Sequence, residues 1–285
     1  MQKRAIAIHD ISCVGRCSLT VALPILSAAG IETSILPTAL LSTHTGEFVD
    51  YTHFDLSDQL SPIANHLKSL DLTWNAIYTG YLASPTQVAQ VENIIKDLKQ
   101  KNTLIFVDPA FGDHGKMYSL LPEDMPMHML HLVKQAHTIV PNVTEACLLL
   151  NTEYIQTPTK EDIELLCKKL HAQGPLQVII TGIFLKGEED KTSIAISEKN
   201  GDITWIQAPR QNGVFHGTGD VYASFLLSAL LNGLSLHDSA SLALSLVQES
   251  IAYTLKEKRP LRYGVAFETA LPNLIYALNN FTNEL

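Results

Sequence analysis

Residues 217–220 read Gly-Thr-Gly-Asp and open a helix-like stretch after the loop NGVFH. Gly217, Thr218 and Gly219 carry no large side chain, so their backbone N–H groups can surround an oxyanion or a phosphate. Neither common nucleotide fingerprint fits, because Tyr222 stands where the dinucleotide pattern has its third glycine and GxxxxGK[ST] occurs nowhere. In the alternative interpretation, Asp220 only stabilises the helix N-terminus, by about 0.3–1 kcal/mol. Spacing alone does not decide between the two.

A second group of residues could organise a metal ion. Asn142 and Glu145 have the spacing of a helix capping box, which needs no ligand, and the cap is the favoured interpretation of Asn142. The functional alternative places Glu145 near a bound Mg²⁺, through water, because Mg²⁺ keeps much of its hydration shell. Asp108 and Asp113, in the segment DPAFGD, could belong to the same acidic cluster.

The composition excludes several classes of protein. The chain has 285 residues, with 20 Lys+Arg against 29 Asp+Glu and a net charge of −9, which argues against a nucleic-acid binder and a polybasic membrane-surface protein. No apolar run approaches the roughly 18 residues of a membrane span, and no signal peptide is recognisable. The four cysteines form no CxxC pair, which is typical of reduced thiols in a cytoplasmic protein.

Strand-like and helix-like segments alternate along almost the whole chain. Short apolar runs predict strands at 4–10, 31–37, 75–80, 103–109, 137–142 and 176–181. Helices are predicted at 18–29, after Ser84–Pro85, from Asn142, from Thr159 with Asp162 as its capping partner, and at about 218–232, 236–257 and 268–280. Segment 191–209 predicts a hairpin around Asn200–Gly201. We therefore expect one α/β domain over residues 1–285, with a mostly parallel central sheet, helices on both faces and an antiparallel hairpin at one edge.

Small and polar residues recur where the predicted strands end. In open α/β sheets, ligands bind at the carboxyl ends of the strands. These positions are His9–Asp10, Thr79–Tyr81, Asp108–Pro109, Pro141–Asn142 and Thr181–Gly182. Each could simply make a turn, but their recurrence over five strands indicates a binding edge.

The motifs in this order carry a resemblance that covers essentially the full length. The chain resembles the ribokinase-like small-molecule kinases and, within them, the pyridoxal (vitamin B6) kinases. GTGD and PNxxE identify the superfamily, and the other motifs point to the B6 branch. The matching segments are HDISCVG at 9–15, STHTG at 42–46, TGY at 79–81, DPAFGDHGKMY at 108–118, PNVTE at 141–145, Thr181–Gly182 and GTGD at 217–220.

This resemblance implies a three-layer sandwich that phosphorylates the 5′-hydroxymethyl group of pyridoxal, pyridoxine or pyridoxamine with ATP. Asp220 would be the base that faces the hydroxymethyl group, and the amides of Gly217, Thr218 and Gly219 would hold the transferring phosphoryl group. The other implied contacts are Asp113 and Glu145 with Mg²⁺ and its waters, Asn142 and Thr181 with the ATP phosphates, and Asp10, Thr45, Tyr81 and Tyr118 with the pyridine substrate, Tyr118 from a flexible loop. In this family a monovalent cation often assists, and the protein is usually a homodimer.

Two features qualify these expectations. A helix N-terminus lowers the pKa of a carboxylate, which would make Asp220 a weak base; orienting the hydroxyl then matters more, since its proton moves late in a loose transition state. Many pyridoxal kinases have serine where this chain has Asp10, and we hypothesise that this carboxylate favours a cationic ring. The alternatives are a hydroxymethylpyrimidine kinase, a branch that commonly carries cysteine at the position of Asp220, and a non-catalytic nucleotide-binding relative. The preferred vitamer, the adenine pocket, the dimer interface and the cation's identity stay open.

Overall fold

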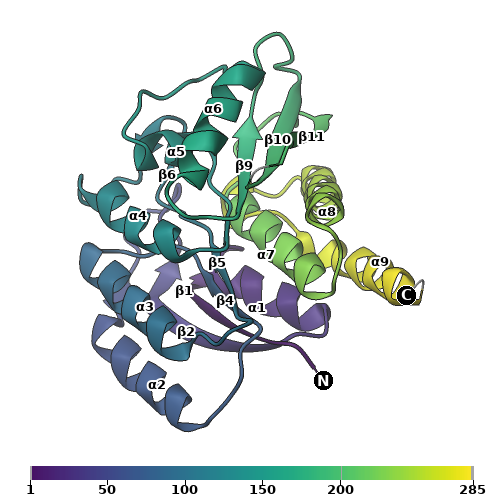
Figure 1. Cartoon of the computed structure of the whole chain (residues 1–285). Coiled ribbons are helices and arrows are strands. Elements are labelled where there is room, and N and C mark those ends of the chain that lie inside the picture. The colour runs from purple at the N-terminus through teal and green to yellow at the C-terminus, as the bar shows by residue number, and fades with distance from the viewer. Residues whose placement is uncertain (1, 200, 284–285) are drawn as a thin grey trace.

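A computed structural model describes residues 2–199 and 201–283. Its described residues build a nine-stranded central sheet in the order β11-β10-β9-β8-β5-β4-β1-β2-β3 (Figure 1). Neighbouring strands from β2 to β9 are parallel, whereas β3 at one edge and β10 and β11 at the other are antiparallel. The strands are β1 (Arg4–Val14), β2 (Glu32–Thr43), β3 (His53–Asp55), β4 (Ala76–Thr79), β5 (Leu104–Val107), β8 (Thr138–Ile139), β9 (Gln177–Ile183), β10 (Lys191–Glu198) and β11 (Ile203–Pro209).

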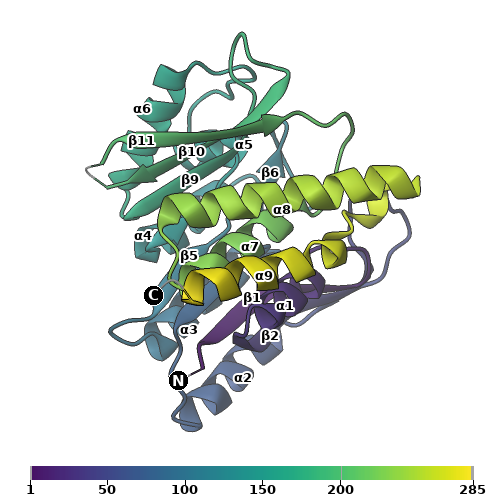
Figure 2. The same ribbon diagram turned by 90° about the vertical axis from the view of Figure 1, so that its right-hand side faces the viewer.

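Helices cover both faces of this sheet, and each face has its own apolar core (Figures 1 and 2). One face carries α1 (Leu19–Ala28), α7 (Thr218–Leu231), α8 (Leu236–Glu257) and α9 (Leu271–Asn283). The other carries α2 (Ser57–Ser69), α3 (Pro85–Leu98), α4 (Met125–Gln135), α5 (Val143–Leu149) and α6 (Lys160–His171). The expected three-layer α/β sandwich is confirmed. In the described residues no helix is both long and apolar enough to cross a bilayer.

Local sequence signals set several helix starts. The side chains of Ser84 and Thr159 accept hydrogen bonds from backbone amides in the first turns of α3 and α6. Thr159 and Asp162 form the expected capping box. Two short 3₁₀ helices, η1 (Leu261–Tyr263) and η2 (Phe267–Thr269), precede α9, so the last α-helix begins at Leu271, slightly later than expected.

The first two strands are longer than the sequence indicated. β4 pairs with β1 only as far as Ile8, but β2 continues beside β1 to Val14 through an irregularity between His9 and Ile11. Asp10 therefore lies inside a strand, at the point where one of its two neighbours ends. The sequence analysis also missed β3, α2 and the small ribbon of β6 (Gly112–Asp113) and β7 (Lys116–Met117). The predicted hairpin forms as β10 and β11, although Asn200 of its turn lies outside the described residues.

Candidate active site

A cavity of about 370 Å³ opens at the carboxyl ends of the central strands. It lies between β1, the loops after β1, β2, β4, β5 and β7, and the N-terminus of α7. Segments from distant parts of the chain therefore meet there, as expected for the ligand edge of a parallel sheet. Six of the residues expected from the sequence line it: Asp10, Thr45, Tyr81, Tyr118, Gly217 and Asp220.

Asp220 lies in the first turn of α7 and is partly open to the cavity. Its carboxylate accepts a hydrogen bond of 2.9 Å from the backbone N–H of Ser18. Burial raises the pKa of Asp220 to about 7; the Ser18 N–H acts in the opposite direction, and the charge of Asp10 adds to the rise. The sequence led us to expect a lowered pKa at this helix N-terminus; burial raises it instead, because loss of hydration outweighs the hydrogen bond from Ser18. A pKa near neutrality suits a general base.

Gly217 caps α7 in the left-handed conformation, with φ of 74°. A side chain there would also collide with the carbonyl oxygen of Arg16, so both backbone and packing require glycine. The first amides of α7, including those of Thr218 and Gly219, have no partner within the helix. Apart from the helix's own backbone and the neighbouring residues, no described atom lies within 4 Å of where a Cβ of Gly219 would be, which leaves space in front of this turn. The helix start can therefore receive an anion.

Glu145 is buried, and its carboxylate is held by backbone amides. One oxygen accepts hydrogen bonds from the N–H groups of Phe111 at 2.9 Å and Gly112 at 3.4 Å, and the other accepts from Asn142 at 2.9 Å. Burial nevertheless raises the pKa of Glu145 to about 8. Asp108 is also buried, and burial, followed by the charges of Glu145 and then Asp220, raises its pKa well above the ordinary value. A cation near these carboxylates would offset their mutual repulsion.

Tyr118 lines the cavity and also lies close to Glu145 and Asp108. The residue as a whole is 43% exposed, but its hydroxyl end faces inward. Burial of that end, and then the charges of Glu145, Asp113 and Asp220, raise the pKa of Tyr118 well above its usual range. The hydroxyl can therefore only act as a neutral hydrogen-bonding group near neutral pH.

Asp113 is less well placed than Glu145 to hold a cation. Its side chain is 55% exposed, and its carboxylate accepts a hydrogen bond of 2.7 Å from the N–H of His114. Throughout residues 2–199 and 201–283, no three His, Cys, Asp or Glu side chains form a group that could bind a metal directly. The carboxylates fit a cation that keeps most of its water and also takes oxygens from a ligand, as Mg²⁺ does.

Asn142 and Thr181 lie side by side but do not line the cavity. The Asn142 side chain accepts from the N–H of Glu145 and donates to the carbonyl of Gly112, so the predicted capping box of α5 is present. The backbone N–H of Thr181 bonds the carbonyl of Pro141 at 3.0 Å.

Sequence reasoning missed several residues of the cavity wall, among them Ser18, His44 and His216. His44 stands in the STHTG motif, where its Nδ1 accepts from the N–H of Gly46 and its Nε2 donates to the carbonyl of Arg262 at 2.6 Å. His216 directly precedes the GTGD motif. Its position one residue before the anion-binding turn was the available signal. Ser18 gave none, because it contributes its backbone.

The cysteines at the start of the chain differ from each other. From the sequence, Cys13 and Cys17 are more readily small packing residues than a redox pair. Cys17 is buried in the cavity wall, in agreement with this prediction, whereas Cys13 is exposed, contrary to it. The spacing of His128 and His131 could suit a metal, but the sequence favours a solvated helix surface. They lie near Asp124 and Glu92 on the surface of α3 and α4, as that prediction requires.

Comparisons with known proteins agree with this geometry. The phosphomethylpyrimidine kinase family model matches residues 27–261. Pyridoxal kinase of Sus scrofa is 31% identical over 225 residues, which are 71% of this chain and 67% of that protein. A Bacteroides thetaiotaomicron protein assigned to the phosphomethylpyrimidine kinases, in a crystal form with pyridoxal, is 36% identical with a TM-score of 0.92 over 96% of both chains. Pyridoxal kinase of Lactobacillus plantarum is 31% identical with a TM-score of 0.89 over 99% of both.

Proposed function

We propose that this chain, which belongs to the phosphomethylpyrimidine kinase family and within it is similar to the pyridoxal kinases, phosphorylates the 5′-hydroxymethyl group of a B6 vitamer with ATP. The family membership makes it a small-molecule kinase. One observation carries the choice of acceptor. The same cavity holds the GTGD turn and Asp10, Thr45 and Tyr81, the residues that the resemblance assigns to a pyridine ring.

Asp220 serves as the general base in this proposal. Its raised pKa lets it accept the proton of the hydroxymethyl group near neutral pH, and the Ser18 N–H fixes the orientation of its carboxylate. The amides of Gly217, Thr218 and Gly219 face the transferring phosphoryl group and stabilise the charge on its oxygens. The cavity therefore supplies positioning and charge stabilisation, the two main requirements of phosphoryl transfer.

Glu145 and Asp113 would hold Mg²⁺ through its waters, with Asp108 adding negative charge nearby. When bound, Mg²⁺ neutralises the phosphate charges as a Lewis acid. The raised pKa values of Glu145 and Asp108 support this assignment, because carboxylates that are costly to ionise alone gain most from a cation. Asn142 and Thr181 would lie along the ATP phosphates, with their backbones joined by a parallel bridge. A monovalent cation would assist, which a comparison of rates in K⁺ and Na⁺ tests.

Asp10 is the proposed determinant of vitamer preference. It is buried, and burial raises its pKa despite hydrogen bonds and the charge of His53, which act in the opposite direction. A protonated pyridine nitrogen or an amine beside it would compensate for that cost. Asp10→Asn should therefore raise the KM of the cationic vitamers most. If KM and kcat for every vitamer were unchanged, Asp10 would have no part in recognition.

The experiment that tests the proposal is a panel of pyridoxal, pyridoxine and pyridoxamine with ATP and Mg²⁺, with product masses determined. Hydroxymethylpyrimidine is included as a competing acceptor, because the matching family and the Bacteroides relative carry that kinase's name. We expect phosphate transfer to a B6 vitamer with the higher kcat/KM. Preference for the pyrimidine would replace the proposal with the thiamine-pathway kinase. ATP binding without any transfer would leave a non-catalytic relative.

We also propose that the protein acts as a homodimer through the β2–β3 edge. Leu40 and Phe54 are cross-strand partners, exposed by 43% and 66%, and Val49 in the loop between these two strands is exposed as well. Apolar side chains on an exposed edge favour association. Light scattering should give twice the chain mass, and Phe54→Glu should lower it. Tyr276→Glu on α9, 69% exposed, is the matched control that should not. A monomeric wild-type protein would contradict this assignment.

A further inference from the structure

Among the described residues, the Asp220 carboxylate accepts one hydrogen bond, from the backbone N–H of Ser18. Ser18 lies in the loop between β1 and α1, residues Gly15–Ser18. We propose that the ion pair of Arg16 and Glu268 is a positioning pair, which fixes this loop so that the Ser18 amide points at the Asp220 carboxylate. The inference deepens the proposed function, since it rests on Asp220 as the base.

Arg16 joins the loop to the C-terminal part of the chain. Its Nε donates to an oxygen of Glu268 at 2.8 Å, and its side chain is only 19% exposed. Its backbone N–H donates to the carbonyl of Tyr263 at 3.1 Å. Its carbonyl oxygen lies against Gly217 and Gly264, and a side chain at either glycine would collide with it. Arg16 is thus held on three sides, and one of these sides is the start of the GTGD turn.

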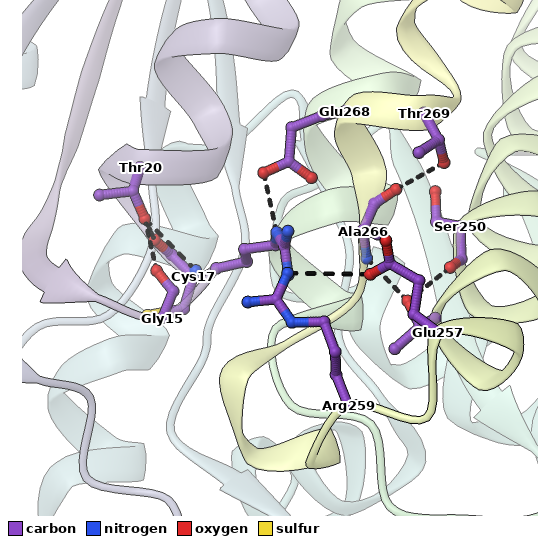
Figure 3. A network of polar contacts seen from close by, with 11 residues as sticks. Gly15, Cys17, Thr20, Ser250, Glu257, Arg259, Ala266, Glu268 and Thr269 are labelled. Carbon is purple, nitrogen blue, oxygen red and sulfur yellow. Dashed lines mark hydrogen bonds and ion pairs between the residues drawn. The ribbon is translucent and has the colours of Figure 1, made fainter.

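Glu268 is itself anchored to a long helix. It lies in η2, and the segment before it is tied to α8 by buried groups (Figure 3). The Thr254 hydroxyl accepts from the N–H of Ala266 at 2.8 Å and donates to the carbonyl of Ser250 at 2.7 Å. Thr269 closes the turn with a bond to the carbonyl of Ala266. The guanidinium of Arg16 therefore meets a carboxylate whose backbone is fixed.

The loop needs such support because its conformation is unfavourable. Ser18 has φ of 51° and ψ of −130°, a region that residues other than glycine rarely adopt, and it is buried. Thr20 supports the loop from the other side, since its hydroxyl donates to the carbonyls of Gly15 and Cys17. Thr20, Arg16 and the Asp220 carboxylate thus all contact the strained backbone, and Arg16 is the one that links it to η2.

Loss of the hydrogen bond from the Ser18 amide would change the pKa of Asp220 in one direction, upward. An N–H that donates to a carboxylate favours its charged form, so its loss raises the pKa of Asp220. The other ionisable groups that face Asp220 are Asp10 on β1, Cys17 in the loop, Tyr78 on β4, Asp108 after β5 and Tyr118 after β7. All of these groups except Cys17 lie outside the loop, and Cys17 is a neutral thiol whose pKa burial raises, so the change in titration can be assigned to the amide.

The test compares Glu268→Gln and Arg16→Met with Glu32→Gln. Glu32 pairs with Arg4 at 2.7 Å at the other end of β1, and the exposures of that pair, 25% and 48%, match the 19% and 49% of Arg16 and Glu268. We expect Glu268→Gln and Arg16→Met to lower kcat roughly 10-fold, with KM for ATP within about twofold of wild type. The acid limb of the kcat–pH profile and the ¹³Cγ titration of Asp220 should both move to higher pH. Glu32→Gln should change none of these.

The proposal is overturned if Glu268→Gln titrates like Glu32→Gln and keeps the wild-type kcat. It is also overturned if kcat falls while the Asp220 titration stays in place, because the pair then acts elsewhere. The ¹³C titration needs no turnover, so it still decides the question if the wild-type protein phosphorylates no B6 vitamer and the proposed function fails. Circular dichroism confirms that each variant is folded, and having two variants keeps the test available if one does not fold.

Discussion

Asp220→Asn should make the protein more stable above neutral pH while it removes the activity. Asparagine has nearly the same shape and can still accept the hydrogen bond from Ser18, so the change removes charge and little else. A general base contributes about 10²- to 10⁴-fold to a rate, and kcat should fall by an amount in that range. The gain in stability follows from the burial that raises the pKa of this carboxyl.

The size of that gain can be worked out from the pKa. A rise from 3.8 to about 7 corresponds to about 4 kcal/mol, at ~1.4 kcal/mol for each tenfold change in the acid constant. The side chain is partly open to water in the cavity, so a gain of roughly 2 kcal/mol is more realistic. Below about pH 4 the carboxyl is protonated in both the folded and unfolded states and costs nothing. Between about pH 4 and 7 only the unfolded state ionises fully, so wild-type stability is lost as pH rises.

The assay is urea denaturation in EDTA at about pH 4.5 and about pH 8. The free energy of unfolding of Asp220→Asn should exceed that of wild type by roughly 2 kcal/mol at the higher pH and by much less at the lower. Asp202→Asn, a change of an exposed aspartate, is the control and should match wild type at both. An equal effect of Asp220→Asn at both pH values would refute the desolvation argument. Retained turnover would refute the role of Asp220 as base.

Three further outcomes are expected. Gly217→Ala should destabilise the protein and abolish activity, because φ is 74° and the added methyl group meets the Arg16 carbonyl. Gly219→Ala should leave the melting temperature near that of wild type. Equal melting temperatures of the two variants would contradict the close contact between Gly217 and Arg16. Asp108→Asn should raise the melting temperature more at about pH 8 than at about pH 5, because burial raises the pKa of this carboxyl. Each kcal/mol gained in the free energy of unfolding corresponds to about 2–4 °C. The same rise at both pH values would contradict the raised pKa of Asp108. Mg²⁺ with ADP should raise the melting temperature of wild type but much less that of Glu145→Gln, as calorimetry can measure; equal shifts would remove Glu145 from the metal site.

The order of elements could be predicted because the local signals agree with the final structure. Short apolar runs became the parallel strands, and Ser84, Thr159 and Asn142 start helices with their own side chains. What the sequence did not reveal depends on distant partners. β1 and β2 extend beyond the apolar runs that predicted them, because the two strands pair with each other as far as Val14 and Thr43. β3 forms only because the edge of β2 is available for pairing.

The same distinction applies to the site. Asp10, Tyr81 and Asp220 could be found from residue type and position at strand or helix ends, and the cavity contains all three. The pKa of Asp220 could not, because it depends on how many atoms exclude water around it, and the sequence gives only the helix dipole that opposes that effect. The contribution of Ser18 was equally hidden, since a backbone amide in an unusual conformation has no signature in the residue type.

The net charge of −9 also has a local meaning in this structure. Asp10, Asp108, Glu145 and Asp220 each have a raised pKa, with burial as the first cause. In the protein without ligand, the pKa values of about 7 for Asp220 and about 8 for Glu145 let these two carboxyls hold protons near neutral pH, which limits their repulsion. A nucleotide polyanion could approach ionised carboxylates only with a cation between them and oriented amides behind the phosphates. A bound Mg²⁺ would favour the ionised form of Asp220 and Glu145, so nucleotide binding should release protons. Because the pKa values of these carboxyls are about 7 and about 8, the release should fall as pH rises from about 6 to about 9, which heats of binding measured in buffers of different ionisation enthalpy can check.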